Sequence, residues 1–506
     1  MLRIDGNSLT LDDLVRVARR HETVALSETA LPGIRASRDV VREILANKDV
    51  VYGITTGVGE LSNRYIPPEK AMRLQLNLIR SHASNVGEAL DRETVRGMML
   101  LRANALAKGF SGVRVELIEK LLELLNKDID PYIPAQGSVG ASGDLSPLAH
   151  LALILTGEGE CRENGKRRPA AEVLKERGIG TLKLQPKEGL ALINGTQVMA
   201  ATGCLVVHDA EGLLKHAQIA GAMSLEALKG TARAFDPRIH AARPHGGQIK
   251  VAATMLGLVR DSAIIASHRH CDKVQDAYTL RCIPQVYGAV WDTIEYARSV
   301  LETEINSATD NPLIFAEEKD VISGGNFHGE PLAFALDFLG IALSEIANIS
   351  ERTVDRLVNP HVSGLPPFLA EDNGLNSGYM IAQYTAAALV SENKVLAHPA
   401  SVDSIPTSAG QEDHVSMGSI SARHARRILE NVIQVLAIEM LAAAQGIDFQ
   451  KPLAPGRGTA AVHRRIRAHI PHWKEDRVMY RDIEKMTEMI RGGDILDAVE
   501  RKGILL

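Results

Sequence analysis

The sequence predicts a mainly α-helical protein organised around a bundle of long helices. Apolar residues recur at helical spacing, aromatic residues make up only 4% of the 506 residues, and alanine and leucine supply much of the apolar content. Three segments, 333–357, 378–396 and 419–445, each carry a wide apolar surface without an internal proline. Helices this apolar must be covered on several sides, which a bundle and contacts between bundles provide.

Local signals predict individual elements along the first half of the chain. Thr10, with Asp13 three positions later, predicts a capped helix that begins at Leu11. The stretch 112–127 is expected to be helical, with one apolar face made of Val115, Ile118, Leu121, Leu122 and Leu125. Asn164-Gly165 predicts the turn of an exposed hairpin. We expect a mixed, mostly helical N-terminal domain over residues 1–200 and a long-helix bundle domain over residues 201–506.

The overall composition favours a soluble protein over a nucleic-acid-binding or membrane protein. Lysine and arginine number 57 and aspartate and glutamate 62, a net charge of −5, so nothing global attracts an anionic partner. The expected partners are small molecules or other copies of the chain. The N-terminus lacks the basic and then apolar regions of a signal peptide, and four cysteines are too few for a disulfide scaffold. These features predict a cytoplasmic protein.

One cluster of potential metal ligands occurs in the sequence "SHRHCD". It contains His268, His270 and Cys271, but this spacing matches no common zinc arrangement, and no C-x-x-C pair is present. The sequence therefore predicts no metal centre.

A glycine-rich stretch, "GSVGASGDLSPLAH" at residues 137–150, needs a chemical explanation. An ordinary loop is one interpretation. A phosphate-binding loop is excluded because G-x-x-x-x-G-K-[ST] is absent, and a hydrolase elbow is excluded because Gly140-Ala141-Ser142-Gly143 does not match G-x-S-x-G.

Another possibility is that the loop reacts with itself. The backbone nitrogen of Gly143 can attack the carbonyl of Ala141, and Ser142 between them can lose water, which gives a five-membered ring with an exocyclic methylene. Glycine permits the close backbone approach that such a ring requires. Ser146-Pro147 then fits the N-cap and first position of a helix whose free N–H groups lie near the ring.

This stretch resembles the signature of the aromatic amino acid ammonia-lyases, whose Ala-Ser-Gly triad matures into 4-methylidene-imidazol-5-one without an external cofactor. Further blocks resemble those of the family and follow its order over nearly the whole chain: "YGITTGVG" (52–59), "NLIRSHASNVG" (77–87), "LINGTQ" (192–197), "QDAYTLRCIPQVYG" (275–288), "DNPLIF" (310–315), "GGNFHG" (324–329) and "QEDHVSMG" (411–418). The resemblance is nearest to the histidine-specific branch. It implies an ammonia-lyase/aspartase-like helical bundle and a homotetramer whose active sites use loops of more than one subunit.

The resemblance implies removal of ammonia from L-histidine to give trans-urocanate. A positioned base contributes roughly 10²- to 10⁴-fold, too little for this elimination, so an electrophile is also needed. The family pattern assigns it to Ala141, Ser142 and Gly143. Tyr52 and Tyr278 match the active-site tyrosines, and we favour Tyr52 as the base for the β-proton.

Other positions match the family's substrate-binding groups. Arg281, three residues after Tyr278, suits bidentate binding of the substrate carboxylate if that segment is helical. Asn194 and Gln275 are expected to orient the amino acid and the ring, and Phe327 resembles the aromatic residue that lines the pocket.

Two positions favour histidine as the substrate. Ser81-His82 stands where phenylalanine-specific relatives tend to carry Phe-Leu and tyrosine-specific ones His-Leu, and Glu412 stands where phenylalanine lyases usually have glutamine. Together His82 and Glu412 supply a donor and an acceptor for the two imidazole nitrogens, whereas a phenyl ring would leave both groups unpaired.

Three alternatives stay open at this point. The first is a phenylalanine or tyrosine ammonia-lyase, or an aminomutase, of the same family. The second is a fumarase/aspartase-type lyase, although the "GSS-x-M-P-x-K-x-N" loop of that class is missing. The third is a non-enzymatic helical scaffold, which would have no use for the ordered polar motifs.

Overall fold

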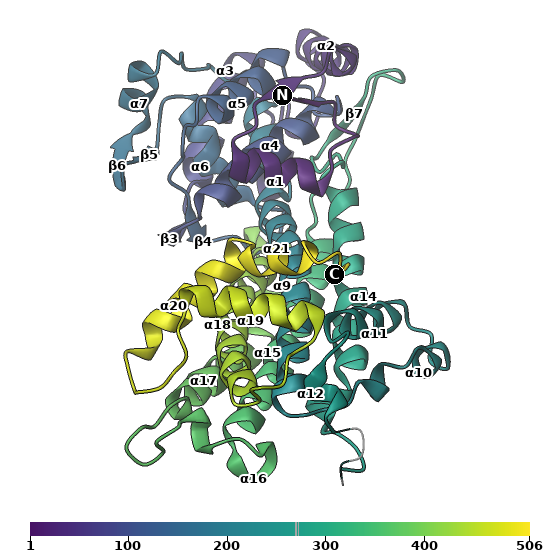
Figure 1. Ribbon diagram of the computed structural model, residues 1–506. Helices are drawn as coiled ribbons and strands as arrows, with labels where there is room; N and C mark the ends of the chain where they lie inside the picture. Colours follow the sequence, from purple (N-terminus) through teal and green to yellow (C-terminus); the bar gives the residue numbers. More distant parts are fainter. Residues whose placement is uncertain (269–270, 272) are drawn as a thin grey trace. The chain divides into compact units, whose positions relative to one another are not determined.

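The computed structural model describes residues 1–268, 271 and 273–506, and most of them are helical, as predicted (Figure 1). They form two compact units. Unit one comprises Met1–His208, Ala297–Asp337 and Pro399–Arg423, and unit two comprises Asp209–Tyr296, Phe338–His398 and His424–Leu506. The units therefore interleave along the chain, whereas the sequence predicts a single division near residue 200. Chain order alone does not reveal that two later segments return to the first unit.

Unit one combines helices with short strand pairs. Its helices are α1 (Leu11–Arg20), α2 (Leu31–Asn47), α3 (Pro68–His82), α4 (Arg92–Ala107), α5 (Val115–Asn126), α6 (Leu145–Leu155), α7 (Ala170–Glu176) and α8 (Glu188–Ile193). Its strands are β1 (Leu2–Ile4), β2 (Val24–Leu26), β3 (Val86–Ala89), β4 (Pro134–Gln136), β5 (Glu160–Glu163), β6 (Lys166–Pro169), β7 (Leu313–Phe315) and β8 (Asp320–Ile322). The pair β1–β2 is parallel, with Leu2 opposite Val24, and the other three consecutive pairs are antiparallel.

Helix α4 is the centre of unit one. All its residues from Thr94 to Ala107 are buried, so it is covered on every side, with α1 and α5 packed against it (Figure 1). Helix α6 packs against α3 and α8 in the same unit. These contacts hold the glycine-rich loop, which directly precedes α6, against rigid elements.

Local predictions in unit one are largely confirmed. Thr10 and Asp13 form a reciprocal capping box at the start of α1. Helix α5 buries Ile118, Leu121, Leu122 and Leu125 as expected. The hairpin β5–β6 turns at Asn164 and Gly165, whose φ values of 50° and 75° lie in the left-handed region that this turn type requires.

The start of α6 differs from the prediction of an N-cap at Ser146. The helix begins at Leu145 and its N-cap residue is Asp144. Ser146 instead accepts a 3.0 Å hydrogen bond from the Ser84 backbone N–H, and Pro147 is tolerated because the first turn of a helix needs no intrahelical donors. The Ser-Pro pair carries the usual signal for a helix start, but tertiary contacts assign Ser146 another partner.

The named elements of unit two, in its described part, are all helices, joined by loops. Helices wholly within it are α10 (Pro237–Ala241), α11 (Gly246–Leu258), α12 (Ala263–Ala266), α13 (Tyr278–Arg281), α16 (Pro360–Ser363), α17 (Met380–Leu396), α19 (Arg457–His469), α20 (Met479–Arg491) and α21 (Asp494–Glu500). Four longer helices have residues in both units: α9 (Gln197–Ala227), α14 (Ile283–Glu304), α15 (Glu330–Val358) and α18 (Gly418–Asp448). The long helices predicted at 333–357, 378–396 and 419–445 are confirmed as α15, α17 and α18. Residues 435–448 of α18 are all buried, which makes this stretch the core of unit two.

Two helices, α15 and α18, are long and apolar enough to cross a membrane. The most apolar stretch of each is largely buried within the fold, 67% for α15 and 89% for α18. Burial of this kind is the pattern of core helices, so their length and composition are weak evidence for a membrane span.

Candidate active site

The Ala141-Ser142-Gly143 loop is held in a tight backbone conformation within unit one. Gly140 and Gly143 have φ values of 73° and 70°, which glycine adopts far more readily than other residues. A Cβ atom on Gly143 would lie 2.1 Å from the carbonyl oxygen of Gly195, so no other residue fits there without a shift of the backbone. The side chain of Ala141 packs with Val415 and Met417. The loop is therefore closely packed on both sides of Ser142.

Asp144 anchors the end of this loop. Its buried carboxylate accepts hydrogen bonds from the backbone N–H groups of Val198 and Met199, at 2.9 and 3.0 Å, and from the hydroxyl of Ser419 at 2.7 Å. Burial raises the pKa of Asp144 to about 6, although these three donors oppose the rise. Its backbone N–H also donates to the Gly195 carbonyl at 2.6 Å. One residue thus ties the loop to α9 and to the start of α18.

Ser142 and Glu412 meet although they are far apart in the sequence. The Ser142 hydroxyl donates a 3.2 Å hydrogen bond to Oε1 of Glu412, and the Thr407 hydroxyl donates a 2.6 Å hydrogen bond to Oε2. Backbone bonds between Thr407 and Glu412 close this segment into a small turn. The predicted acidic residue is therefore held in place next to the central serine of the loop.

His82 belongs to the same neighbourhood. It is the last residue of α3, and its Nδ1 lies 3.1 Å from the hydroxyl of Ser81. Burial lowers the pKa of His82 below its usual value, while the Leu78 carbonyl and the charge of Glu412 partly oppose this shift. His82 therefore carries a neutral imidazole at neutral pH, which can both donate and accept a hydrogen bond.

Asn194 is fixed by a buried polar network. Its amide nitrogen donates to Oδ1 of Asp310 at 3.3 Å and to the carbonyl of Asn311 at 3.1 Å. Asp310 in turn binds Nζ of Lys187 at 2.6 Å, and both of these side chains are almost fully buried. Arg102, also buried, donates to the Asn194 carbonyl at 2.8 Å. Because its amide nitrogen is committed to these acceptors, the orientation of the Asn194 side chain is set by the network.

Tyr52 and Phe327 complete the predicted residues of unit one. Both are half-buried. The Tyr52 hydroxyl accepts a 3.1 Å hydrogen bond from the Gly59 backbone N–H, which fixes the position of the phenol oxygen. Phe327 lies in the connection between β8 and α15.

Three predicted residues, Gln275, Tyr278 and Arg281, belong to unit two. Residues Tyr278–Arg281 form the single helical turn α13. The helix that is required for Tyr278 and Arg281 to share a face is therefore present. The Arg281 guanidinium carbon lies 4.4 Å from the centre of the Tyr278 ring, and Tyr278 is 71% exposed. The structure groups the other predicted residues in unit one. His268 and Cys271 are also in unit two, whereas His270, the third member of the "SHRHCD" cluster, lies outside the described residues.

Known proteins match this chain over nearly its full length. The family model of the aromatic amino acid lyases matches residues 9–468. A histidine ammonia-lyase from Alkaliphilus oremlandii is 55% identical over 500 residues, covering 99% of this chain and 98% of that protein. One from Caldanaerobacter subterraneus is 56% identical over 503 residues, covering 99% of each chain. The chain belongs to the aromatic amino acid lyase family.

Solved aromatic amino acid lyase structures have the same fold. The crystal structure of histidine ammonia-lyase from Trypanosoma cruzi superposes with a TM-score of 0.92 at 47% identity, covering 99% of this chain and 95% of that one. Tyrosine aminomutase from Streptomyces globisporus superposes with a TM-score of 0.95 at 41% identity, covering 99% and 98%. Since proteins named for different reactions share this fold equally well, residues rather than fold must distinguish the reactions.

Several residues of this candidate site were not identified from the sequence. Asp144 and Asp310 stand inside recognised motifs, "GASGDLS" and "DNPLIF", so their acidic side chains within otherwise apolar or small blocks were a usable signal. No such signal in the sequence marked Lys187 or Thr407. They are ordinary residues in unremarked segments, and their importance arises only from the partners that folding brings to them.

Proposed function

We propose that this aromatic amino acid lyase is a carbon–nitrogen lyase that converts L-histidine to trans-urocanate and ammonia without oxidation. The observation that carries the proposal is the hydrogen bond between Ser142 and Glu412, whose charge also acts on His82. A neutral imidazole and a carboxylate beside the reactive loop match the two nitrogens of a substrate imidazole. The full-length relatives named histidine ammonia-lyase support the same assignment.

The Ala141-Ser142-Gly143 segment is proposed to form the 4-methylidene-imidazol-5-one group, with no external cofactor. The close approach of Gly143 to Gly195 and the left-handed backbone at Gly143 fit the compact ring that these residues would make. When formed, the group supplies an electrophile, which no unmodified side chain offers. The residues around it bind, orient and move protons.

Removal of the β-proton is assigned to a tyrosine. We favour Tyr52, whose hydroxyl oxygen accepts the Gly59 N–H bond, and keep Tyr278 as the alternative. The phenol of an ordinary tyrosine has a pKa of about 10, so a phenolate base requires hydrogen-bond donors or positive charge nearby. Near Tyr278, the guanidinium of Arg281 lies over the phenol ring.

Substrate binding is assigned to the remaining predicted residues. Arg281 is proposed to bind the substrate carboxylate in a bidentate pair, and Gln275 and Asn194 to hold the amino acid in orientation. For Asn194, the amide nitrogen is committed to Asp310 and Asn311, and we assign to its side-chain oxygen the role of accepting from the amino group of the substrate. Phe327 is proposed to line the pocket.

We further propose that the protein assembles as a homotetramer in the cytoplasm. Helix α17 buries only Ala382, Ala386 and Asn393, while Ile381, Tyr384 and Val395 are 59%, 61% and 72% exposed. An apolar helix exposed to this extent is typical of a subunit interface. The four cysteines are all free thiols, which suits a reducing compartment.

The deciding experiment measures product absorbance on three amino acids and the mass of the chain. We expect urocanate from histidine, with little cinnamate from phenylalanine or coumarate from tyrosine, and no β-amino acid product of an aminomutase. We also expect the intact chain to be lighter than its sequence by two water molecules. Negligible turnover of histidine overturns the substrate assignment, and an unmodified mass in active protein overturns the electrophile.

A further inference from the structure

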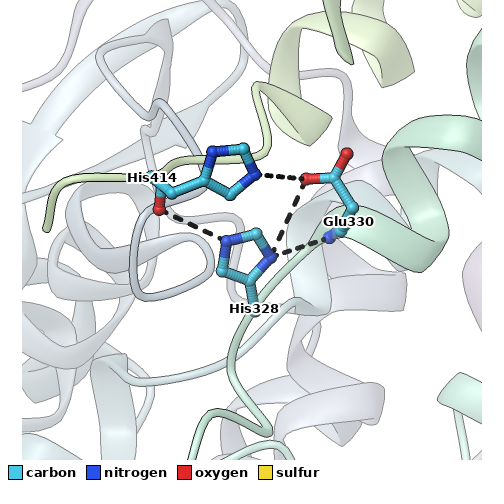
Figure 2. A group of neighbouring side chains, drawn as sticks. All are labelled: His328, Glu330 and His414. Atoms are coloured by element: carbon cyan, nitrogen blue, oxygen red, sulfur yellow. Dashed lines mark hydrogen bonds and ion pairs between the residues drawn. The ribbon is translucent and has the colours of Figure 1, made fainter. Parts of the chain in front are cut away.

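Three side chains of unit one that the proposed reaction does not use converge at one point. They are His328, which directly follows Phe327, Glu330 at the start of α15, and His414, two residues after Glu412. One potential ligand atom from each lies within 4.8 Å of the other two (Figure 2). Because more than 80 residues separate His414 from the other two, no motif in the sequence predicts this cluster.

The buried carboxylate oxygen of Glu330 points at both imidazoles. Its Oε2 lies 3.9 Å from Nδ1 of His328 and 3.9 Å from Nε2 of His414 (Figure 2). Among the described residues, this oxygen has no hydrogen-bond partner although it is buried. A buried carboxylate oxygen without a donor is costly, and a cation between the three side chains would satisfy it.

The imidazole of His328 is already arranged as metal-bound histidines usually are. Its Nε2 lies 3.3 Å from the carbonyl oxygen of His414, and a carbonyl only accepts, so the proton is on Nε2. The neutral ring then presents the lone pair of Nδ1 toward Glu330, where it accepts a long 3.3 Å bond from the Glu330 backbone N–H. Metal-ligating histidines commonly donate their other N–H to a backbone carbonyl in this way. The Glu330 N–H belongs to a first helical turn, where water can replace the lost acceptor.

We propose that His328, Glu330 and His414 bind a divalent transition-metal ion, with Zn²⁺ as the best match. Two imidazoles and one carboxylate suit Zn²⁺ better than Mg²⁺ or Ca²⁺, which prefer oxygen ligands. Bond lengths of about 2.0–2.2 Å place tetrahedral ligand atoms about 3.3 Å apart, so the three atoms need to approach by a modest distance. His414, whose side chain is 69% exposed, has room to make that adjustment, and water takes the fourth position.

Such an ion would join two segments that are distant in the sequence. The loop that ends in Phe327 and His328 leads into α15, and the segment with Glu412 and His414 leads into α18. The two already pack closely, since a Cβ atom on Gly329 would lie 2.8 Å from the Ser416 hydroxyl oxygen. The ion would hold the two segments together from their exposed side. The site does not depend on the proposed lyase activity.

The test is Zn²⁺ binding by the purified full-length protein after treatment with a chelator. Calorimetry and elemental analysis are run without histidine, because the free amino acid itself binds Zn²⁺. We expect one bound ion per chain, with affinity reduced at least about 10-fold in Glu330→Gln and His414→Asn. The matched control is His361→Asn, which removes an exposed histidine of unit two and should bind as the wild type does.

Two further measurements keep the proposal testable if a variant folds poorly. Co²⁺ bound to the wild type should give the intense visible bands of a tetrahedral site, and these should be lost in Glu330→Gln. Hydrogen exchange should slow in residues 324–330 and 404–416 when Zn²⁺ is added to the wild type. The proposal is overturned if the wild type binds no Zn²⁺, or if Glu330→Gln and His414→Asn bind it as tightly as the wild type.

Discussion

The hydroxyl of Ser142 donates a hydrogen bond of 3.2 Å to the carboxylate of Glu412, a residue 270 positions further along the chain. This contact joins the loop proposed to provide the electrophile to the residue proposed to select the substrate. It also orients the hydroxyl that is proposed to leave as water. Reaction chemistry and substrate choice therefore meet at one pair of side chains.

The first prediction concerns Ser142→Ala. The substitution removes the hydroxyl that must be lost while changing little volume at a half-buried position, so the protein should fold with a nearly unchanged Tm. Turnover of histidine should fall by at least about 10³-fold, because the remaining groups do not replace an electrophile. Urocanate absorbance and intact mass are the measurements. Near-normal turnover in this variant would contradict the mechanism.

The second prediction concerns Gly143→Ala. The new Cβ would lie 2.1 Å from the Gly195 carbonyl oxygen at a φ of 70°, so the loop must shift and the chain should retain its unmodified mass. Left-handed φ alone costs a non-glycine residue about 1–3 kcal/mol. Gly165→Ala is the matched control, because Gly165 has a φ of 75° with nothing within 4 Å of its Cβ position. Equal effects of the two variants on activity would show that strain, and not the close approach, is what matters.

The third prediction concerns Glu412→Gln. The change keeps the shape but replaces a charged acceptor for the substrate imidazole, so kcat/KM for histidine should fall roughly 10- to 100-fold. Activity on phenylalanine, relative to histidine, should rise. Asp413→Asn removes the same charge from the adjacent exposed residue and should leave both activities unchanged. Steady-state kinetics on the two amino acids are the measurement. If kcat/KM of Glu412→Gln fell equally for histidine and phenylalanine, the role of Glu412 in substrate choice would be wrong.

The fourth prediction concerns Lys187 and Asp310, which act as positioning residues for Asn194. Lys187→Met leaves the Asp310 carboxylate buried without its cation, so it should lower the free energy of unfolding by about 3–5 kcal/mol. The double variant Lys187→Met/Asp310→Asn removes both charges and should recover much of that stability. Its histidine turnover should stay reduced, because the acceptor that orients Asn194 is changed. Thermal unfolding measures the effect on stability, and separate values of kcat and KM measure the effect on catalysis. Full recovery of histidine turnover in the double variant would exclude a positioning role.

The fifth prediction concerns pH and His216, a buried histidine of α9 in unit two. Burial lowers the pKa of His216 from its ordinary value of 6.5 to about 4. Between these two values the unfolded chain binds the proton and the folded chain does not, so stability falls as the pH drops through this window. The loss should reach ~3 kcal/mol.

The measurement is thermal unfolding between pH 7.5 and pH 4.5. His216→Phe fills a similar volume without a titratable group and removes Nε2, which is buried without a partner among the described residues. The variant should lose less stability on acidification than the wild type. His361→Gln, at an exposed position, should behave as the wild type does. Parallel curves for wild type and His216→Phe would refute the assignment.

The sequence by itself determined the features that depend on neighbouring residues. The capping box at Thr10 and Asp13, the turn at Asn164-Gly165 and the long apolar helices all follow from interactions within one or a few turns of chain. The order of the motifs also predicted the family, which the comparisons confirm. Such signals lie within short stretches of the chain and can therefore be identified from the sequence without the three-dimensional structure.

Only the tertiary structure decided which distant residues meet. It moved the N-cap of α6 from Ser146 to Asp144, brought Glu412 to Ser142, and buried Lys187 against Asp310. It also gathered His328, Glu330 and His414 at one point. The physical reason is that burial and partner choice depend on packing between segments hundreds of residues apart, and local periodicity carries no information about which segments those are.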